Sequence, residues 1–245
     1  MAILQNGIFT TLLTNFQITE GSIGYYAITI GLIAIVIIAS YLLGSISSAI
    51  TISRLLYRED IRNHGSGNAG MTNMLRTYGK GAAFLTWLGD MLKTVFSVLF
   101  AALIFGFSYN NWISLNGICY LAGLCAVLGH VYPVYYGFKG GKGVLVTVIM
   151  MLVLCPPLFL LLMSTFVIIV AISRYVSLAS CCVASLLPIA FTLYSFFLGG
   201  EIPPLMVICT VILGGFIVWC HRANIQRLKA GNEKKLSIGK KKKKD

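Results

Sequence analysis

Long apolar runs, separated by short polar segments, dominate this chain. A helix that crosses a bilayer needs about 20 mainly apolar residues. The runs that fit or approach this length are 25–52, 82–107, 113–134, 144–154, 158–172, 178–198 and 205–220. The pattern therefore predicts an all-α integral membrane protein with about seven transmembrane helices.

Two of these runs, 144–154 and 158–172, are short for a full crossing, and Cys155-Pro156-Pro157 separates them. Proline lacks a backbone N–H and interrupts a helix, so we expect two helices here that are tilted, partial or paired. The membrane region is expected to be a single domain over 25–228. An N-terminal extension (1–24) precedes it, and a basic cytoplasmic tail (229–245) follows.

Composition excludes a soluble globular domain. Hydrophobic residues make up 58% of the 245 residues and charged residues only 11%, whereas soluble domains average about 25% charged residues. The net charge of +12 would suggest nucleic acid as a partner for a soluble protein. In a membrane protein such an excess reports orientation instead, and no nucleic-acid partner is expected.

The basic residues support one orientation. If the C-terminus is cytoplasmic and the helices are odd in number, four segments share one side: 53–81, 135–143, 173–177 and 221–245. These segments hold every lysine and arginine except Lys93, and the opposite loops 108–112, 155–157 and 199–204 hold none. Because basic loops stay cytoplasmic, we predict an external N-terminus and a cytoplasmic C-terminus.

Buried polar residues and cysteines receive structural interpretations. Asp90 and Lys93 lie three residues apart on one predicted helix. Such a pair inside a membrane most simply neutralises itself or pairs with a neighbouring helix. The cysteines form no C-x-x-C and no zinc spacing with histidine, which favours apolar packing. No metal site or cofactor is predicted.

The first chemical motif is the predicted cytoplasmic loop 62–76, rich in glycine and asparagine. Gly65, Gly67 and Gly70 leave backbone N–H groups exposed, and such loops bind anions at helix N-termini. The spacing also matches a dinucleotide fingerprint formally, but no strand precedes it and Asp90 lies in an apolar run, so we reject that interpretation. A plain flexible loop is the alternative.

The second motif covers 129–143 and ends in Lys139, Gly140, Gly141, Lys142 and Gly143, just before the helix at 144. Lysines among glycines at a helix N-terminus form a second candidate phosphate site. It is not a Walker A loop, because glycine rather than serine or threonine follows Lys142. Membrane-flanking basic anchors are the alternative, and they explain Lys139 as well as function does.

Two further clusters lie on the same predicted side. RYVSLAS (174–180) contains Ser180, and the alternative is a capped turn. In HRANIQRL (221–228), His221, Asn224 and Arg227 share one helical face. The alternative there is a basic helix that touches anionic lipid.

Two anion sites on one membrane face suggest two phosphates, or one phosphate and a developing oxyanion, and hence lipid synthesis. The Ser/His/Asp order of hydrolases is absent, as is the histidine-and-aspartate signature of soluble acyltransferases. Catalysis would then depend on positioning and electrostatics. A phosphate-ester transporter and a non-catalytic lipid-binding protein are the rivals, but we see no internal repeat of the kind that many transporters carry.

Four strings in order carry a resemblance: GSGNAGMTNMLR (65–76), GHVYPVYYGFKGGKGV (129–144), RYVSLAS (174–180) and HRANIQRL (221–228). With YLLGSIS (41–47), they closely resemble the bacterial acyl-phosphate:glycerol-3-phosphate acyltransferases over about 41–233. Met71 and Leu145-Val146 depart from the usual small residue and Ala-Thr. The resemblance implies a seven-helix enzyme of the bacterial inner membrane, with its active site facing the cytoplasm. It would transfer an acyl group from acyl phosphate to the 1-hydroxyl of glycerol 3-phosphate, giving 1-acylglycerol 3-phosphate (lysophosphatidate) and phosphate, the first step of phospholipid synthesis.

The expected substrates are acyl phosphate and glycerol 3-phosphate, with membrane lipid as surroundings and an upstream acyl-phosphate-forming enzyme as the supplier of the donor. No cofactor is implied. The candidate catalytic residues are Ser66, Arg76, Lys142, His221 and Asn224. The candidate substrate-binding residues are Gly65, Gly67, Asn68, Thr72, Asn73, Lys139, Gly140, Gly141, Gly143 and Ser180.

Overall fold

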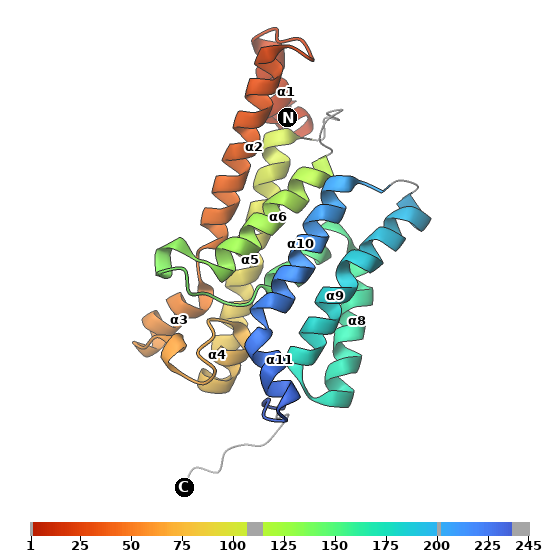
Figure 1. The fold of residues 1–245 in the computed structure, drawn as a ribbon. Helices are drawn as coiled ribbons and strands as arrows, with labels where there is room; N and C mark the ends of the chain where they lie inside the picture. Colours follow the sequence, from red (N-terminus) through yellow and green to blue (C-terminus); the bar gives the residue numbers. More distant parts are fainter. Residues whose placement is uncertain (1, 107–114, 200–201, 237–245) are drawn as a thin grey trace.

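The structure, a computed structural model, describes residues 2–106, 115–199 and 202–236. These residues form α-helices joined by short turns, and no strand occurs among them (Figure 1). The α-helices are α1 (Ala2–Asn15), α2 (Ile23–Gly44), α3 (Ser48–Tyr57), α4 (Met71–Tyr78), α5 (Lys80–Phe105), α6 (Leu115–Val131), α7 (Val144–Leu154), α8 (Pro156–Ser173), α9 (Val176–Tyr194), α10 (Pro204–Cys220) and α11 (Arg222–Lys229). Short 3₁₀ turns at Ile61–Asn63 and Val134–Tyr136, and a π turn at Ser195–Gly199, complete the elements.

The first predicted helix, 25–52, is divided into two α-helices, although residues 23–57 count together as one candidate membrane span. α2 ends at Gly44, and α3 begins after Ser47, whose hydroxyl accepts a hydrogen bond from the N–H of Ile50 at 3.4 Å. Gly44 also packs so closely on α6 that a Cβ there would lie 2.3 Å from the carbonyl oxygen of Ala126. Close packing and a serine cap therefore redirect the chain where hydrophobicity alone predicts continuity.

The remaining predicted helices agree well with the structure. The break at Cys155-Pro156-Pro157 is confirmed, because α7 ends at Leu154 and α8 begins at Pro156. The predicted loop 53–81 contains more structure than expected, since α4 forms within it. Phe107 and the predicted loop 108–112 lie outside the described residues.

Within the described residues, five helical segments are long and apolar enough to cross a membrane. A sixth arises if α10 and α11, which meet at a 54° bend, count together, and α7 is a shorter apolar helix. Many apolar side chains of these segments point outward, including Ile30 and Ile38 on α2 and Leu160 and Ile168 on α8. The described chain is thus a helical membrane protein, and the count of seven stays a prediction.

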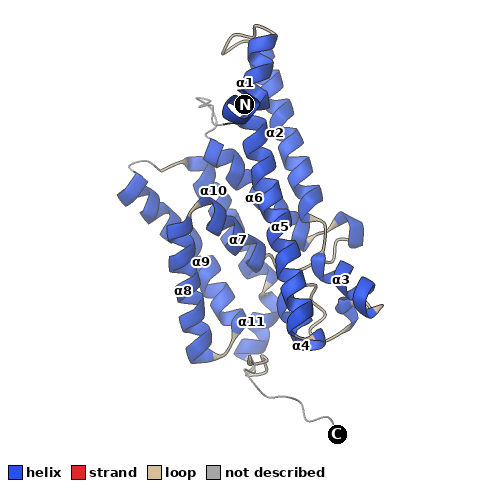
Figure 2. Cartoon of the chain, turned by 180° about the vertical axis from the view of Figure 1, so that it is seen from behind, coloured by secondary structure: helices blue, strands red, loops and turns tan. Residues whose placement is uncertain are grey.

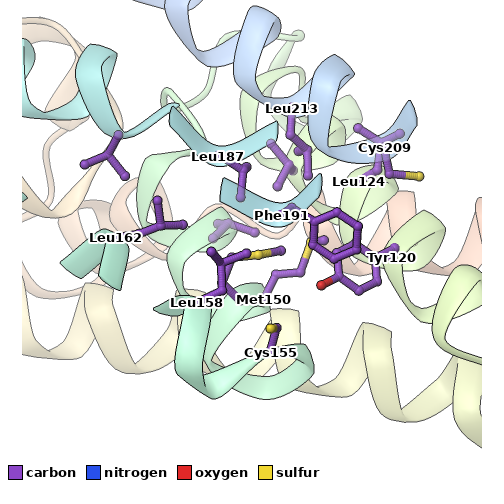
Figure 3. Packing of buried hydrophobic residues seen from close by; sticks show 14 of the residues in the cluster. Tyr120, Leu124, Met150, Cys155, Leu158, Leu162, Leu187, Phe191, Cys209 and Leu213 are labelled. Carbon is purple, nitrogen blue, oxygen red and sulfur yellow. The ribbon is translucent and has the colours of Figure 1, made fainter. Parts of the chain in front are cut away.

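Two apolar clusters hold the bundle together. One joins α6 to α10 and includes Tyr120, Met150, Leu158 and Phe191 (Figure 3). The other joins α1, α2, α5 and α6. In that cluster Phe9 of α1, 4% exposed, contacts the rings of Tyr25 and Phe105, so the predicted N-terminal extension includes a packed helix.

The polar motifs gather at one end of the bundle. α3, α4 and α11 lie at this end in both views, while α1 lies at the opposite end (Figures 1 and 2). α7 packs against α5, α6 and α8 inside the bundle (Figure 2). Gly143 directly precedes α7, so the second glycine motif enters the interior beside the first.

Candidate functional site

Asn73 organises the first loop from its centre. Its side-chain oxygen accepts a hydrogen bond from the N–H of Ser66 at 2.9 Å. Its side-chain nitrogen donates to the carbonyl oxygens of Ile61, His64 and Asn68 at 2.9 to 3.3 Å. The side chain is 2% exposed. Asn73 thus fixes the shape of the loop. This is a structural role, whereas the sequence predicted that Asn73 binds substrate.

Glycine is required where this loop turns. Gly65 and Gly67 have φ of +62° and +72°, a region that L-residues with a side chain rarely adopt. A Cβ on Gly65 would also lie 2.2 Å from the side-chain oxygen of Asn73. The motif therefore folds around Asn73 and leaves the hydroxyl of Ser66 on the exposed side of the loop.

Arg62 connects the first loop to the second. Its guanidinium donates to Asp60 and to the carbonyl oxygens of Tyr136 and Lys139, at 2.7 and 3.2 Å for the two carbonyls. The hydrogen bonds from Arg62 lower the pKa of the Asp60 carboxyl, so it stays ionised. An open polar pocket lies between the loops here, and Gly67, Lys139 and Gly140 contribute to its wall.

The second loop packs tightly under the first. The N–H groups of Gly140 and Gly141 donate to the carbonyl oxygens of Val131 and His130, at 3.0 and 3.1 Å. A Cβ on Gly141 would lie 2.9 Å from the carbonyl oxygen of Ala69 in the first loop. Gly143, with φ of +81°, turns the chain into α7. Only glycine at these positions lets the two loops approach so closely.

Lys142 points toward α11, away from the open pocket. Its ammonium donates to the side-chain oxygen of Asn224, and the Asn224 nitrogen donates to Glu233 at 2.7 Å. Burial, together with the positive charge of Arg227, lowers the pKa of Lys142. Lys142 and Asn224, which lie far apart in sequence, thus form one half-buried polar centre.

Glu233 completes this centre, and sequence reasoning did not select it. Its carboxylate accepts hydrogen bonds from Ser177 at 2.9 Å and from Arg227 at 2.7 Å, as well as from Asn224. Burial opposes the charge, but these hydrogen bonds outweigh it and lower the pKa of Glu233. The available signal was an acid isolated within the basic segment that follows α10.

Ser180 and His221 line the same region from α9 and α10. Ser180 is 3% exposed, and its hydroxyl donates to the carbonyl oxygen of Val176. The Nδ1 atom of His221 lies 2.8 Å from the carbonyl oxygen of Ile217. Because a carbonyl can only accept, Nδ1 carries the proton and Nε2 of a neutral ring is left as an acceptor.

Several predicted site residues, among them Ser66, Thr72 and Arg76, make no hydrogen bond to this centre within the described residues. The side chains of Ser66, Thr72 and Arg76 make no hydrogen bond or ion pair within the described residues, and Ser66 and Arg76 are exposed. No hydrogen bond among these residues links them to Lys142 or Asn224. The structure thus joins the two loops through Arg62 and through close backbone packing, and it leaves Arg76 without a partner among the described residues.

A narrow apolar pocket begins beside Ser180 and runs between α7, α8, α9 and α10. Its wall includes Val144, directly after the second loop, and Met151, Phe159 and Ala184 farther along. The Thr147 hydroxyl also borders it and is buried without a hydrogen-bond partner. The pocket suits an alkyl chain whose polar end lies near Lys142.

The pairing of Asp90 with Lys93 is confirmed at 2.8 Å, and both side chains are buried. The cysteines of the described residues are free thiols, and several lie in the apolar core. Among the same residues, no three His, Cys, Asp or Glu side chains are grouped so that they could hold a metal ion.

The chain is similar to known proteins along most of its length. The family model described as glycerol-3-phosphate acyltransferase matches residues 34–231. A glycerol-3-phosphate acyltransferase of Syntrophomonas wolfei is 43% identical over 83% of this chain and 97% of its own. Those of Clostridioides difficile and Pseudomonas aeruginosa are 41% and 42% identical, over 85% and 80% of this chain and 96% of each of theirs.

Two solved structures are also similar. The crystal structure of PlsY, an integral membrane glycerol 3-phosphate acyltransferase, in its glycerol 3-phosphate form has a TM-score of 0.71 and 35% identity. The alignment covers 84% of this chain and 96% of that one. The lysophosphatidic acid form has a TM-score of 0.69 and 33% identity, over 84% and 95%.

Proposed function

This chain belongs to the glycerol-3-phosphate acyltransferase family, and on that premise we propose that it uses acyl phosphate as its acyl donor. It transfers the fatty acyl group to the 1-hydroxyl of glycerol 3-phosphate and releases 1-acylglycerol 3-phosphate and inorganic phosphate. The observation that carries the proposal is the position of Lys142 and Asn224 near an apolar pocket that begins at Ser180.

Charge supports a donor that is itself a phosphate. Both proposed substrates are phosphate anions, so they repel each other unless cations lie between them. The site offers Lys142 in the half-buried centre and Arg76, which has no partner among the described residues. Lys139 adds a third cation, on the wall of the open polar pocket. The site thus carries enough positive charge for two phosphate groups, more than glycerol 3-phosphate alone needs.

In the proposed arrangement, the acyl chain occupies the pocket between α7 and α10, and its phosphate lies on the glycine loops. Lys142 and Arg76 neutralise the phosphates. The side chains of Ser66 and Asn68 hold the oxygens of the leaving phosphate, because the N–H groups of Ser66, Gly67, Gly70, Gly140 and Gly141 already donate to groups of the protein. Ser180, His221 and Asn224 orient glycerol 3-phosphate so that its 1-hydroxyl meets the acyl carbon.

The hydroxyl attacks the acyl carbon, the bond from that carbon to the phosphate oxygen breaks, and phosphate leaves with the bonding electrons. We propose that a phosphate oxygen of a substrate takes the hydroxyl proton, because the second pKa of a phosphate monoester is about 6. His221 presents Nε2 as an acceptor and is the alternative base. If His221 is the base, His221→Ala abolishes turnover and added imidazole restores it; we expect residual turnover that imidazole does not increase.

The proposed surroundings are the bacterial inner membrane, crossed seven times, with the N-terminus outside and the glycine loops and C-terminus in the cytoplasm. The clustering of α3, α4 and α11 at one end supports a single active face. Soluble glycerol 3-phosphate then reaches the loops from water, while the acyl chain of the donor stays in the bilayer.

The direct test uses the purified full chain in lipid vesicles. Acyl phosphate and glycerol 3-phosphate are supplied together and separately, and phosphate release is followed against spontaneous hydrolysis. We expect rapid release only when both substrates are present, with one 1-acylglycerol 3-phosphate formed per phosphate. No release above background at any acyl-chain length would overturn the proposal.

A further inference from the structure

Three ionisable side chains form a buried cluster beneath the glycine loops. The ammonium of Lys93 lies 2.8 Å from Asp90 Oδ1 and 3.0 Å from His130 Nδ1, and it donates to the carbonyl oxygen of Ile46 at 2.9 Å. Ser48 donates to the same Asp90 oxygen at 3.0 Å. Each of the three ionisable side chains is at most 5% exposed. Asp90 and Lys93 already balance each other's charge, so the contact of Lys93 with His130 calls for a separate explanation.

This geometry fixes the tautomer of His130. An ammonium has three donors and no acceptor, and here its three partners are Asp90, Ile46 and His130. Nδ1 of His130 lies 3.0 Å from the ammonium and 3.6 Å from Asp90 Oδ1. The closer contact is to a group that can only donate, so Nδ1 is the acceptor. The proton of the neutral ring then lies on Nε2.

Nε2 is directed at the second glycine loop. A Cβ on Gly141 would lie only 2.0 Å from this atom, so the imidazole edge occupies the space beside the Gly141 backbone. Within the described residues, Nε2 makes no hydrogen bond. The carbonyl oxygen of Ala69, from the first loop, borders the same space. An N–H donor without a partner thus lies where both loops meet.

We propose that Asp90 and Lys93 present the Nε2–H of His130 as a hydrogen-bond donor to an anionic phosphate oxygen held by the loop 139–143. Lys93 sets the tautomer, and Asp90 compensates the charge of Lys93. His130 is then a substrate-binding residue, and Asp90 and Lys93 are positioning residues. The proposal rests on the phosphate-handling function proposed above.

Two substitutions of one residue separate this role from packing. His130→Gln places an amide near the position of Nε2, whereas His130→Asn places one near Nδ1 and leaves the Gly141 side empty. A hydrogen bond to a charged group contributes roughly ten- to a hundredfold to binding. We expect H130N to lower kcat/KM by about that factor, and H130Q to recover a large part of the loss.

The matched measurements are the unfolding temperature in the same vesicles and the inhibition constant of inorganic phosphate, used as the anion probe. We expect both variants to unfold at similar temperatures, with phosphate inhibition weakened in H130N and largely kept in H130Q. Equal activity and phosphate inhibition in the two variants would overturn the proposal, as would losses that only follow the unfolding temperature. An inactive wild type would instead refute the proposed function. The donor would then still be tested by whether inorganic phosphate raises the unfolding temperature of H130Q more than that of H130N.

Discussion

The two glycine loops solve the problem of holding an anion in different ways. The loop around Asn73 is rigid in its backbone, but Arg76 projects from it without a partner among the described residues. The loop 139–143 is built against Val131 and His130, and its cation already donates to Asn224. In the loop 139–143 the cation Lys142 is already held by Asn224. In the loop around Asn73 the cation Arg76 has no partner among the described residues and can turn toward a bound anion. The difference predicts distinct costs for the two charges.

Loss of Lys142 should have the largest effect. Lys142→Met keeps the length of the side chain but removes the charge and leaves Asn224 without its donor. Removal of one preorganised donor from an active site costs about 10² to 10³ in kcat, and loss of the charge adds to this. We expect at least a thousandfold lower phosphate release. Lys80→Met, at an exposed lysine outside the site, is the control, and similar activity of the two variants would contradict the account.

Arg76→Gln should have the second-largest effect on activity, but it should leave stability unchanged. Arg76 is exposed and makes no hydrogen bond or ion pair within the described residues, so the unfolding temperature should not change. Phosphate release should nevertheless fall by about a hundredfold. Arg76→Lys should restore only part of it, because lysine cannot bind phosphate in the bidentate way of arginine. Wild-type kinetics in R76Q would show that Arg76 does not neutralise a substrate phosphate.

Asn73 tests the rigid backbone of the first loop. Asn73→Ala removes four hydrogen bonds, and an unsatisfied buried group costs about 1–3 kcal/mol. We expect a lower unfolding temperature and a loss of activity of about tenfold or more. Asn116→Ala, at an exposed side chain near the start of α6, should change neither quantity. Activity that survives N73A would show that the loop need not be preformed.

A substitution in the wall of the apolar pocket should have a smaller effect, limited to the preference for acyl-chain length. Ala184 lines the pocket, whereas Ile189 on the same helix faces outward. Ala184→Phe should shorten the acceptable chain and change the preference for short over long acyl phosphates by about tenfold, since one methylene is worth about 1–3 kcal/mol. Ile189→Phe should leave the preference unchanged. Equal chain-length profiles would place the acyl chain elsewhere.

The pH dependence gives the smallest expected change. The pKa of Lys142 is lowered by burial and by Arg227, so Lys142 loses its charge, and the enzyme its activity, as the pH rises through this lowered value. Arg227→Gln removes the repulsion and frees Glu233 to act on Lys142, and both changes raise the pKa of Lys142. The alkaline limb of the pH–rate profile should move to higher pH. Arg222→Gln, on the same helix, should not move it, and a shift to lower pH in R227Q would contradict the assignment.

The sequence predicted the membrane class, most helix positions and the Asp90–Lys93 pair, because these depend on local hydrophobicity and spacing. It missed the break at Ser47, since close packing of Gly44 on α6 causes it. It also missed Glu233 and the role of His130, because their partners come from other helices. The candidate residues were found as motifs, but the hydrogen bond between Lys142 and Asn224 joins segments far apart in sequence and could not be read from either motif.

The central claim is that the chain acylates glycerol 3-phosphate with acyl phosphate through two phosphate-binding loops. The most direct measurement compares donors in the same vesicles: acyl phosphate, acyl coenzyme A and acyl carrier protein with one acyl chain. Mass spectrometry measures 1-acylglycerol 3-phosphate, and a colorimetric assay measures phosphate. The account predicts product only from acyl phosphate, with one phosphate released per product. Equal product from acyl coenzyme A, without phosphate release, would contradict it.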